Sequence, residues 1–173
     1  MNDFTTPVCK HKLPLLVYWL YGGGNSMSTA AESIIRQDIG EVWNSSGSLD
    51  IIDEIVAEDF VFYDPMGFAE IRGPDEYRKF AERFRAAFAN MGTEIEEIIA
   101  KDDRVAARVT MRATHEGEFI GIEPTNREVE LKGIVIEHIE DGKIKDKYIN
   151  DDRLTFFAQL GAVEPPDELI TSH

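Results

Sequence analysis

A strand that runs into a loop shaped by glycine and proline constrains the fold of this chain more than any other feature. Between residues 105 and 113, apolar side chains alternate with polar or small ones, which is typical of a strand with one buried face. The next stretch, 114–127, reads THEGEFIGIEPTNR. Gly117 and Gly121 permit backbone turns that other residues resist, and Pro124 cannot donate a ladder hydrogen bond. Because apolar residues resume after this stretch, we expect two strands joined by a long, shaped loop.

The remaining patterns predict the element order ααβαββββ. Apolar residues recur at helical spacing in the first part of the chain, and strand-like segments dominate after Gly92. Thr29 and Glu32 form the pattern of a capping box at the start of the first helix. The predicted helices cover 29–43, 49–56 and 73–90, a strand starts at 60 and stops at Pro65, four strands lie near 93–101, 103–116, 127–140 and 143–150, and a helical turn covers 152–160.

Two further motifs accompany the loop, namely the hairpin sequence EDGKI at 140–144 and the tail QLG at 159–161. Together with the loop they resemble the SnoaL-like polyketide cyclases of the nuclear transport factor 2-like superfamily, over about residues 34–161. The resemblance implies an α+β, cone-shaped fold in which three helices pack on a curved antiparallel sheet and enclose a pocket. It also implies chemistry that needs no cofactor.

Length and charge limit the partners. A chain of 173 residues suits a single domain, and its net charge of −15, from 33 acidic and 18 basic residues, repels nucleic acid and anionic lipid. We therefore expect a small apolar molecule as partner, and neither nucleic acid nor a membrane. The acidic residues are scattered, which favours a solvated surface of the kind found in halophilic organisms.

The chain divides into three predicted segments. Residues 1–26 contain an apolar run, Leu13–Tyr21, that is too short to span a bilayer. We expect them to be an extension that adds little to the core, with the native start at Met27 and a cytoplasmic location. A single domain then covers 27–164, and 165–173 form a tail.

Metal-binding patterns are scarce. Cys9 is the only cysteine, and the four histidines show no His-x-x-x-His spacing. The sequence therefore predicts no metal site.

The loop Glu140-Asp141-Gly142 suggests a register for the last hairpin. If it is a three-residue loop, Ile139 pairs with Lys143, and Tyr148 then faces Ile134. Val135, Glu137, Ile139, Lys145, Lys147 and Ile149 share one face by this count; Ile134, Ile136, His138, Ile144, Asp146, Tyr148 and Asp152 share the other. Gly133 is a candidate for a bulge.

The proposed acid/base pair of the SnoaL-like cyclases falls on unsuitable residues. The resemblance places the aspartate of that family at Ile149 and its histidine at Val135, and neither side chain here can move a proton. Asp152 is the first substitute, although it needs a bulge to share the face of Ile149 and could instead cap the last helical turn.

Three other side chains are candidates, each with a structural alternative. Tyr63 could stabilise an enolate oxygen or be a core tyrosine. His115 could act as a base or order the glycine-rich loop. Asp146 could face the pocket or solvent. The predicted catalytic set is Asp152, Tyr63 and His115, and the predicted pocket is lined by Tyr148, Asp146, Val135, Ile149, Phe84 and Trp43.

Three functions stay open. The first is a cofactor-free aldol or ester cyclase acting on a small apolar keto compound, and the second is a binding protein that keeps only the pocket. The third is the epoxide-hydrolase-like or steroid-isomerase-like chemistry of the wider superfamily. A homodimer is expected, because the outer face of the sheet, with Arg108, Thr110 and Arg112, needs cover.

Overall fold

The first described residues are already helical. The structure is a computed structural model, and it describes residues 28–64 and 70–164. Residues 28–37 are α-helical and continue into a π-helical turn, η1 (Asp38–Val42). The capping box had predicted Thr29 as the N-cap of this helix. Because residue 28 is already helical, Thr29 instead lies inside the helix, and this prediction was wrong. The predicted extension and tail lie outside the described residues.

The order of the elements follows the sequence patterns closely. One short strand between β1 and α3 was not predicted, because two residues are too few to leave a pattern. The elements after η1 are α2 (Ile51–Ile55), β1 (Val56–Tyr63), β2 (Ile71–Arg72), α3 (Gly73–Ala87), β3 (Phe88–Lys101), β4 (Arg104–His115), β5 (Glu128–Glu140), β6 (Lys143–Asp151) and α4 (Arg153–Leu160).

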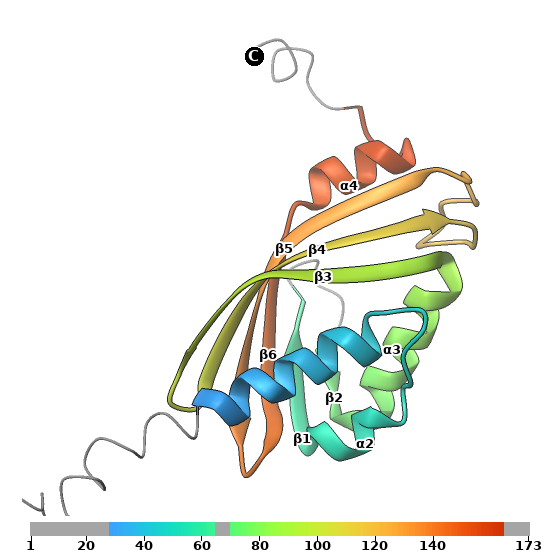
Figure 1. The fold of residues 1–173 in the computed structure, drawn as a ribbon. Coiled ribbons are helices and arrows are strands. Elements are labelled where there is room, and N and C mark those ends of the chain that lie inside the picture. The colour runs from blue at the N-terminus through green and yellow to red at the C-terminus, as the bar shows by residue number, and fades with distance from the viewer. Residues whose placement is uncertain (1–27, 65–69, 165–173) are drawn as a thin grey trace, which may run out of the picture.

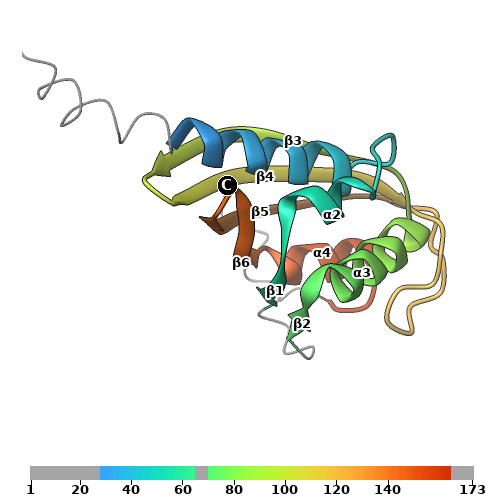
Figure 2. The same cartoon turned by 90° about the horizontal axis from the view of Figure 1, so that it is seen from below.

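The strands form one curved sheet in the order β2-β1-β6-β5-β4-β3. The helix formed by 28–42, together with α2 and α3, covers its concave side, and α4 packs at the far end against β5 (Figures 1 and 2). This is the α+β cone that the sequence predicted. The expectation of a wholly antiparallel sheet was wrong, because β1 pairs with β6 in parallel, with Tyr63 beside Tyr148. The long connection through α3 and the four strands β2 to β5 allows the chain to return in the same direction.

The hairpin between β5 and β6 is tighter than predicted. Asp141 and Gly142 have φ of 50° and 77°, so a two-residue turn pairs Glu140 with Lys143. A bulge follows, and beyond it Ile136 pairs with Tyr148. The predicted register was therefore wrong by two residues beyond the bulge. A register shift of two residues leaves each side chain on the same face of the sheet. Most side chains of this hairpin therefore lie on the face that was predicted for them.

Two apolar clusters fill the space between the helices and the sheet. The larger one lies under the first helix and α3 and includes Ile35, Val42 and Phe60. The smaller one surrounds Phe88 and Phe156 near the far end. Within the described ranges, no helix combines the length and the apolar character that crossing a bilayer requires.

Candidate active site

An apolar cavity of about 80 Å³ lies between the sheet and the helices. Val135 on β5 and Ile149 on β6 are direct cross-strand neighbours and both line it. The predicted pocket residues Phe84 and Trp43 line it as well, from α3 and from the end of the first helix. The two positions at which the resemblance placed a proton-transfer pair thus share the cavity, and both are apolar.

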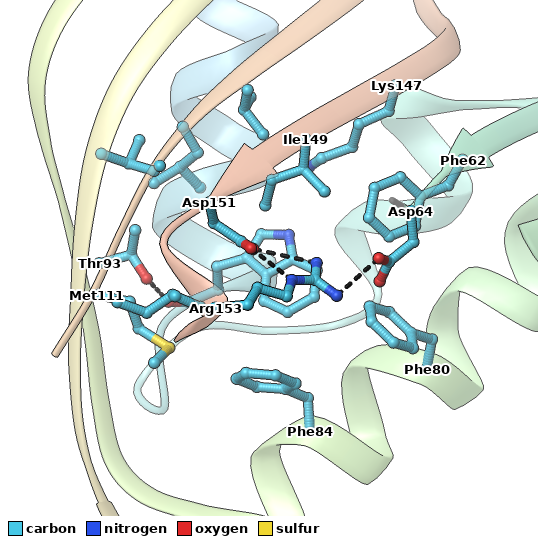
Figure 3. A pocket seen from close by; sticks show the side chains of 16 residues that line it. Phe62, Asp64, Phe80, Phe84, Thr93, Met111, Lys147, Ile149, Asp151 and Arg153 are labelled. Atoms are coloured by element: carbon cyan, nitrogen blue, oxygen red, sulfur yellow. Dashed lines mark hydrogen bonds and ion pairs between the residues drawn. The ribbon is translucent and has the colours of Figure 1, made fainter. Parts of the chain in front are cut away.

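Three charged side chains border the cavity at its mouth. Arg153, the first residue of α4, places its guanidinium between the carboxylates of Asp151 and Asp64 (Figure 3). Its Nη1 lies 2.7 Å from Asp64 Oδ1, its Nη2 lies 3.1 Å from Asp151 Oδ2, and its Nε donates to Asp151 Oδ1. We call Asp64, Arg153 and Asp151 the mouth trio. The side chains of the two aspartates are only 5% and 2% exposed.

The mouth trio is strongly polarised. Burial of Arg153 opposes its charge, but hydrogen bonds to Asp151 and Asp64 outweigh burial and raise the pKa of its guanidinium above the usual value. The guanidinium thus holds the Asp64 and Asp151 side chains in place at the edge of the cavity. A carboxylate oxygen at the edge of an apolar cavity is positioned to accept a proton from a bound molecule.

A glycine makes room for Asp151. Gly133 on β5 is its cross-strand partner, and a Cβ at 133 would lie 2.9 Å from the Asp151 Cβ and 3.0 Å from the Asn150 carbonyl oxygen. The predicted bulge at Gly133 was wrong, since the β5–β6 register is continuous there. The glycine instead permits close approach of the two strands.

A second, larger hollow of about 620 Å³ adjoins the first. The loop after β4 contributes Phe119 and Ile120 to its wall, and α4 contributes Phe156 and Phe157. Six residues line both spaces: Asp64, Phe80, Phe84, Leu131, Asp151 and Arg153. The mouth trio therefore lies at the boundary between the inner cavity and the outer hollow.

A second ionic cluster closes the inner end. Lys147 on β6 donates from its Nζ to Tyr77 Oη at 2.9 Å and to Asp38, and it lies 3.2 Å from Glu137 Oε1. Tyr77 donates to Asp38 Oδ1 at 2.7 Å, and Trp43 Nε1 donates to Tyr77 Oη at 2.8 Å. We call Lys147, Asp38, Tyr77 and Glu137 the floor cluster.

Burial dominates the protonation of the floor cluster. It raises the pKa of Glu137 to about 8, even though Lys147 is close, and it raises the pKa of Tyr77 above the usual value. At neutral pH Glu137 is therefore mostly protonated, and Asp38 and Lys147 form a neutral ion pair.

Asp152 does not line either space. It is the N-cap of α4, where its carboxylate accepts a hydrogen bond from the Thr155 backbone N–H at 3.2 Å. Because β6 ends at Asp151 without a bulge in that stretch, Asp152 points away from the face of Ile149. The position next to it supplies the inward carboxylate.

Three more predicted residues lie on the outer face of the sheet. Tyr63 stacks on Tyr148 with ring centres 4.5 Å apart, and neither borders the cavity. Asp146 binds His138 Nδ1 at 2.9 Å and Arg104 at 3.2 Å. Alternation along β1 and β6 turns these side chains outward while Phe62 and Ile149 turn inward.

His115 orders the loop that follows β4. It is fully buried, its Nδ1 lies 3.1 Å from Thr125 Oγ1, and its backbone N–H donates to the Arg127 carbonyl. Burial lowers the pKa of the imidazole. Gly117 lies against α3, where a Cβ would come within 2.3 Å of the Ala86 carbonyl oxygen. This arrangement fits the ordering role and places His115 outside both spaces.

The sequence reasoning passed over Asp64, Asp151 and Arg153. A signal for Asp151 was present, because it shares the strand parity of Ile149, whereas Asp152 does not. Within the described part of the chain, no group of three or more His, Cys, Asp or Glu side chains is arranged to hold a metal ion.

Comparison with known proteins identifies the family. A sequence model of the SnoaL-like polyketide cyclases matches residues 33–160. The chain belongs to the SnoaL-like polyketide cyclase family. It is similar to the aklanonic acid methyl ester cyclase AcmA of Streptomyces galilaeus, with 28% identity over 130 residues, which cover 74% of this chain and 89% of AcmA.

Solved structures of two SnoaL-like relatives show the same cone. IdmH of Streptomyces antibioticus, a candidate polyketide cyclase, is 28% identical with a TM-score of 0.66, over 76% of this chain and 98% of IdmH. AclR of Streptomyces galilaeus, a candidate hydroxylase, is 26% identical with a TM-score of 0.70, over 83% of this chain and 88% of AclR. Because these two names describe different reactions, the shared fold does not by itself define the reaction of this chain.

Proposed function

We propose that this SnoaL-like protein is a cofactor-independent cyclase that closes a ring in a small polyketide-derived keto ester. The position of Asp151 carries the proposal, because this carboxylate borders both the inner cavity and the outer hollow while Arg153 lies beside it. A pocket without an inward carboxylate would have favoured a binding protein. The mouth trio supplies two.

The proposed chemistry is an intramolecular aldol closure. Asp151 removes a proton from the carbon next to a ketone, and the negative charge that develops on the ketone oxygen faces the Arg153 guanidinium. The enolate carbon attacks a second carbonyl in the same molecule, so one carbon–carbon bond forms and a C=O π bond becomes an alkoxide. The proton held by Asp151 returns to that alkoxide. Product and substrate have the same atoms, and no oxidant or reductant is needed.

The outer hollow has the size that such a substrate needs. Its volume of about 620 Å³ lies in the range of small-molecule sites, roughly 300–1,000 Å³. Phe119, Phe156 and Phe157 offer flat apolar surfaces to a ring system. The reacting carbon then lies where the hollow meets the mouth trio.

Asp151→Asn tests the proposal against the matched variant Asp152→Asn. Aklanonic acid methyl ester is the first substrate to assay, because AcmA is named for its cyclisation. Asp151→Asn keeps the shape but removes the basic oxygen, so turnover should fall by roughly 10²–10⁴-fold with similar binding. Asp152→Asn should retain turnover. If the native protein binds this ester without converting it, or if Asp151→Asn retains turnover, the binding-protein alternative is favoured.

We also propose a homodimer formed through the outer face of the sheet. Ile134, Ile136 and Tyr148 are 49%, 42% and 43% exposed on that face. Arg108 and Arg112 form ion pairs with neighbouring glutamates there, whereas Thr110 is buried beneath Glu96. Sedimentation at micromolar concentration should show a dimer that Ile136→Lys converts to monomer, and a monomeric native protein would contradict it.

A further inference from the structure

The apolar residues that line the inner cavity have no part in the proton transfer proposed at its mouth. Along β6, Lys147, Ile149 and Asp151 face the same side, so the charged ends are separated by an apolar middle (Figure 3). At a rise of about 3.3 Å per residue, Asp151 lies roughly 13 Å along the strand from Lys147. Val135, Val109 and Phe62 line the space with Ile149.

The polar groups of this inner wall are already bound to protein. Thr93 Oγ1 donates to the Trp43 carbonyl at 2.7 Å, and Trp43 Nε1 donates to Tyr77. The ammonium of Lys147 is held by the carboxylate of Asp38, the carboxyl group of Glu137 and the hydroxyl of Tyr77. A ligand hydroxyl or carbonyl in the inner cavity would therefore lose its water without gaining a donor, which disfavours polar ligand groups.

The volume limits what can enter. An engineered apolar cavity of about 150 Å³ holds benzene, and a water molecule takes a share of about 30 Å³ in the liquid. The inner cavity, at about 80 Å³, is therefore too small for an aromatic ring and suits about three carbon atoms.

We propose that the substrate carries a saturated alkyl group of two or three carbons next to the reacting ketone, and that this group occupies the inner cavity. The ketone then lies at the mouth beside Arg153 and Asp151, and the remaining rings occupy the outer hollow. The inference rests on the proposed function for the position of the ketone. It adds the substrate class: keto esters that end in an ethyl or propyl ketone, with methyl ketones and aryl ketones binding more weakly.

A homologous series of small keto esters tests this directly by equilibrium binding. The probes are methyl 3-oxobutanoate, 3-oxopentanoate, 3-oxohexanoate and 3-oxoheptanoate, with methyl benzoylacetate as the aryl ketone. Each methylene that enters the cavity should tighten the dissociation constant by about fourfold. We expect the gain to continue to the propyl ketone and then to reverse for the butyl and phenyl ketones. Equal affinity across the series, or tightest binding of the phenyl ketone, would overturn the inference.

Two variants locate the effect. Ile149→Phe fills the inner cavity and should abolish the gain with chain length, whereas Ile136→Phe, on the outer face of the neighbouring strand, should preserve it. Val135→Ala enlarges the cavity and should move the optimum to a longer alkyl group, so the proposal stays testable if Ile149→Phe misfolds. An unchanged optimum in Val135→Ala would contradict it.

Failure of the inference and failure of the proposed function give different results. Asp151→Asn should retain the dependence of binding on chain length, because the side chain at 151 acts on the proton and not on the alkyl group. If the dependence is present while the native protein shows no Asp151-dependent turnover, the cyclase proposal fails and the alkyl subsite stands. If turnover depends on Asp151 but binding ignores chain length, only the subsite is overturned.

Discussion

The floor cluster and the mouth trio contain similar groups but have different surroundings. Each holds one cation between two carboxylic groups, Asp38 and Glu137 around Lys147, and Asp64 and Asp151 around Arg153. In the floor cluster only Lys147 borders the cavity, while Asp38, Tyr77 and Glu137 are enclosed by protein, so burial keeps Glu137 protonated and leaves the cluster neutral. The mouth trio, in contrast, borders two spaces. A buried carboxylate becomes chemically useful when one of its sides faces room for a substrate.

The first way to break this comparison is to remove the cation of the floor cluster. Lys147→Met removes the ammonium that Asp38 and the Tyr77 hydroxyl both contact and leaves the Asp38 carboxylate buried without a cation, and such a loss typically costs about 3–5 kcal/mol of stability. The free energy of unfolding, measured by urea denaturation of the variant and the native protein, should show this loss. The matched variant Lys145→Met removes an exposed ion pair with Asp59, which water screens, and should cost much less stability. Equal losses would mean that the floor cluster contributes no more than a surface pair.

Arg153→Lys sharpens the role of the mouth trio. A lysine keeps the charge but cannot contact both aspartates with a planar fork. Losing one hydrogen bond to a charged group costs about 1.5–3 kcal/mol, so we expect turnover to fall by roughly 10–100-fold. Arg112→Lys on the outer face should leave turnover unchanged. A fully active Arg153→Lys would show that the guanidinium geometry is not needed.

The third test uses the protonation of Glu137. Its pKa is about 8 in the folded protein against 4.5 for the ordinary carboxyl, so between these values the folded state binds a proton that the unfolded state has lost. Stability contributed by this proton is fully present below about pH 4.5 and is lost as the pH rises through about 8, with a slope of up to ~1.4 kcal/mol per pH unit. Glu137→Gln should flatten the profile of unfolding free energy between pH 5 and 8. An unchanged slope would show that Glu137 is ionised in the fold.

The smallest expected effect separates Asp152 from its neighbour. Asp152→Ala removes the cap of α4 and should cost about 1 kcal/mol of stability, measured by thermal unfolding. Turnover should not change, because the side chain lies outside both spaces. A large loss of turnover at native stability would return the proton-transfer role to Asp152.

The sequence predicted the fold well because its patterns are local. Alternation in β4, β5 and β6 marked the strands, and the loop and hairpin motifs indicated the family. Val135, Ile149, Phe84 and Trp43 line one common space, since parity and helical spacing decide which way a side chain points. Ile144 was predicted to lie on the opposite face from Ile139. This was wrong, because the irregular register next to the turn pairs Ile144 directly with Ile139.

The ionic residues of the site were harder to predict for a physical reason. Along a strand, a displacement of one residue reverses the face, so choosing Tyr63 and Asp152 meant missing Asp64 and Asp151 beside them. Arg153 joins the two aspartates only because β1 and β6 lie side by side in parallel, which is a non-local pairing. Neither spacing nor composition shows that contact.

The contact between Gly133 and Asp151 has a consequence for changing this protein in the laboratory. Any larger residue at 133 would push its Cβ against that of Asp151, so the two positions are not independent. If a mutant library varies only position 151, every new side chain must fit the narrow space that Gly133 leaves for an aspartate. If it varies only position 133, the new side chain displaces the carboxylate of Asp151. Moving the proposed base deeper along β6, for example to 149, would release 133 from this requirement. Directed evolution of a new ring closure should therefore randomise 133, 149 and 151 together.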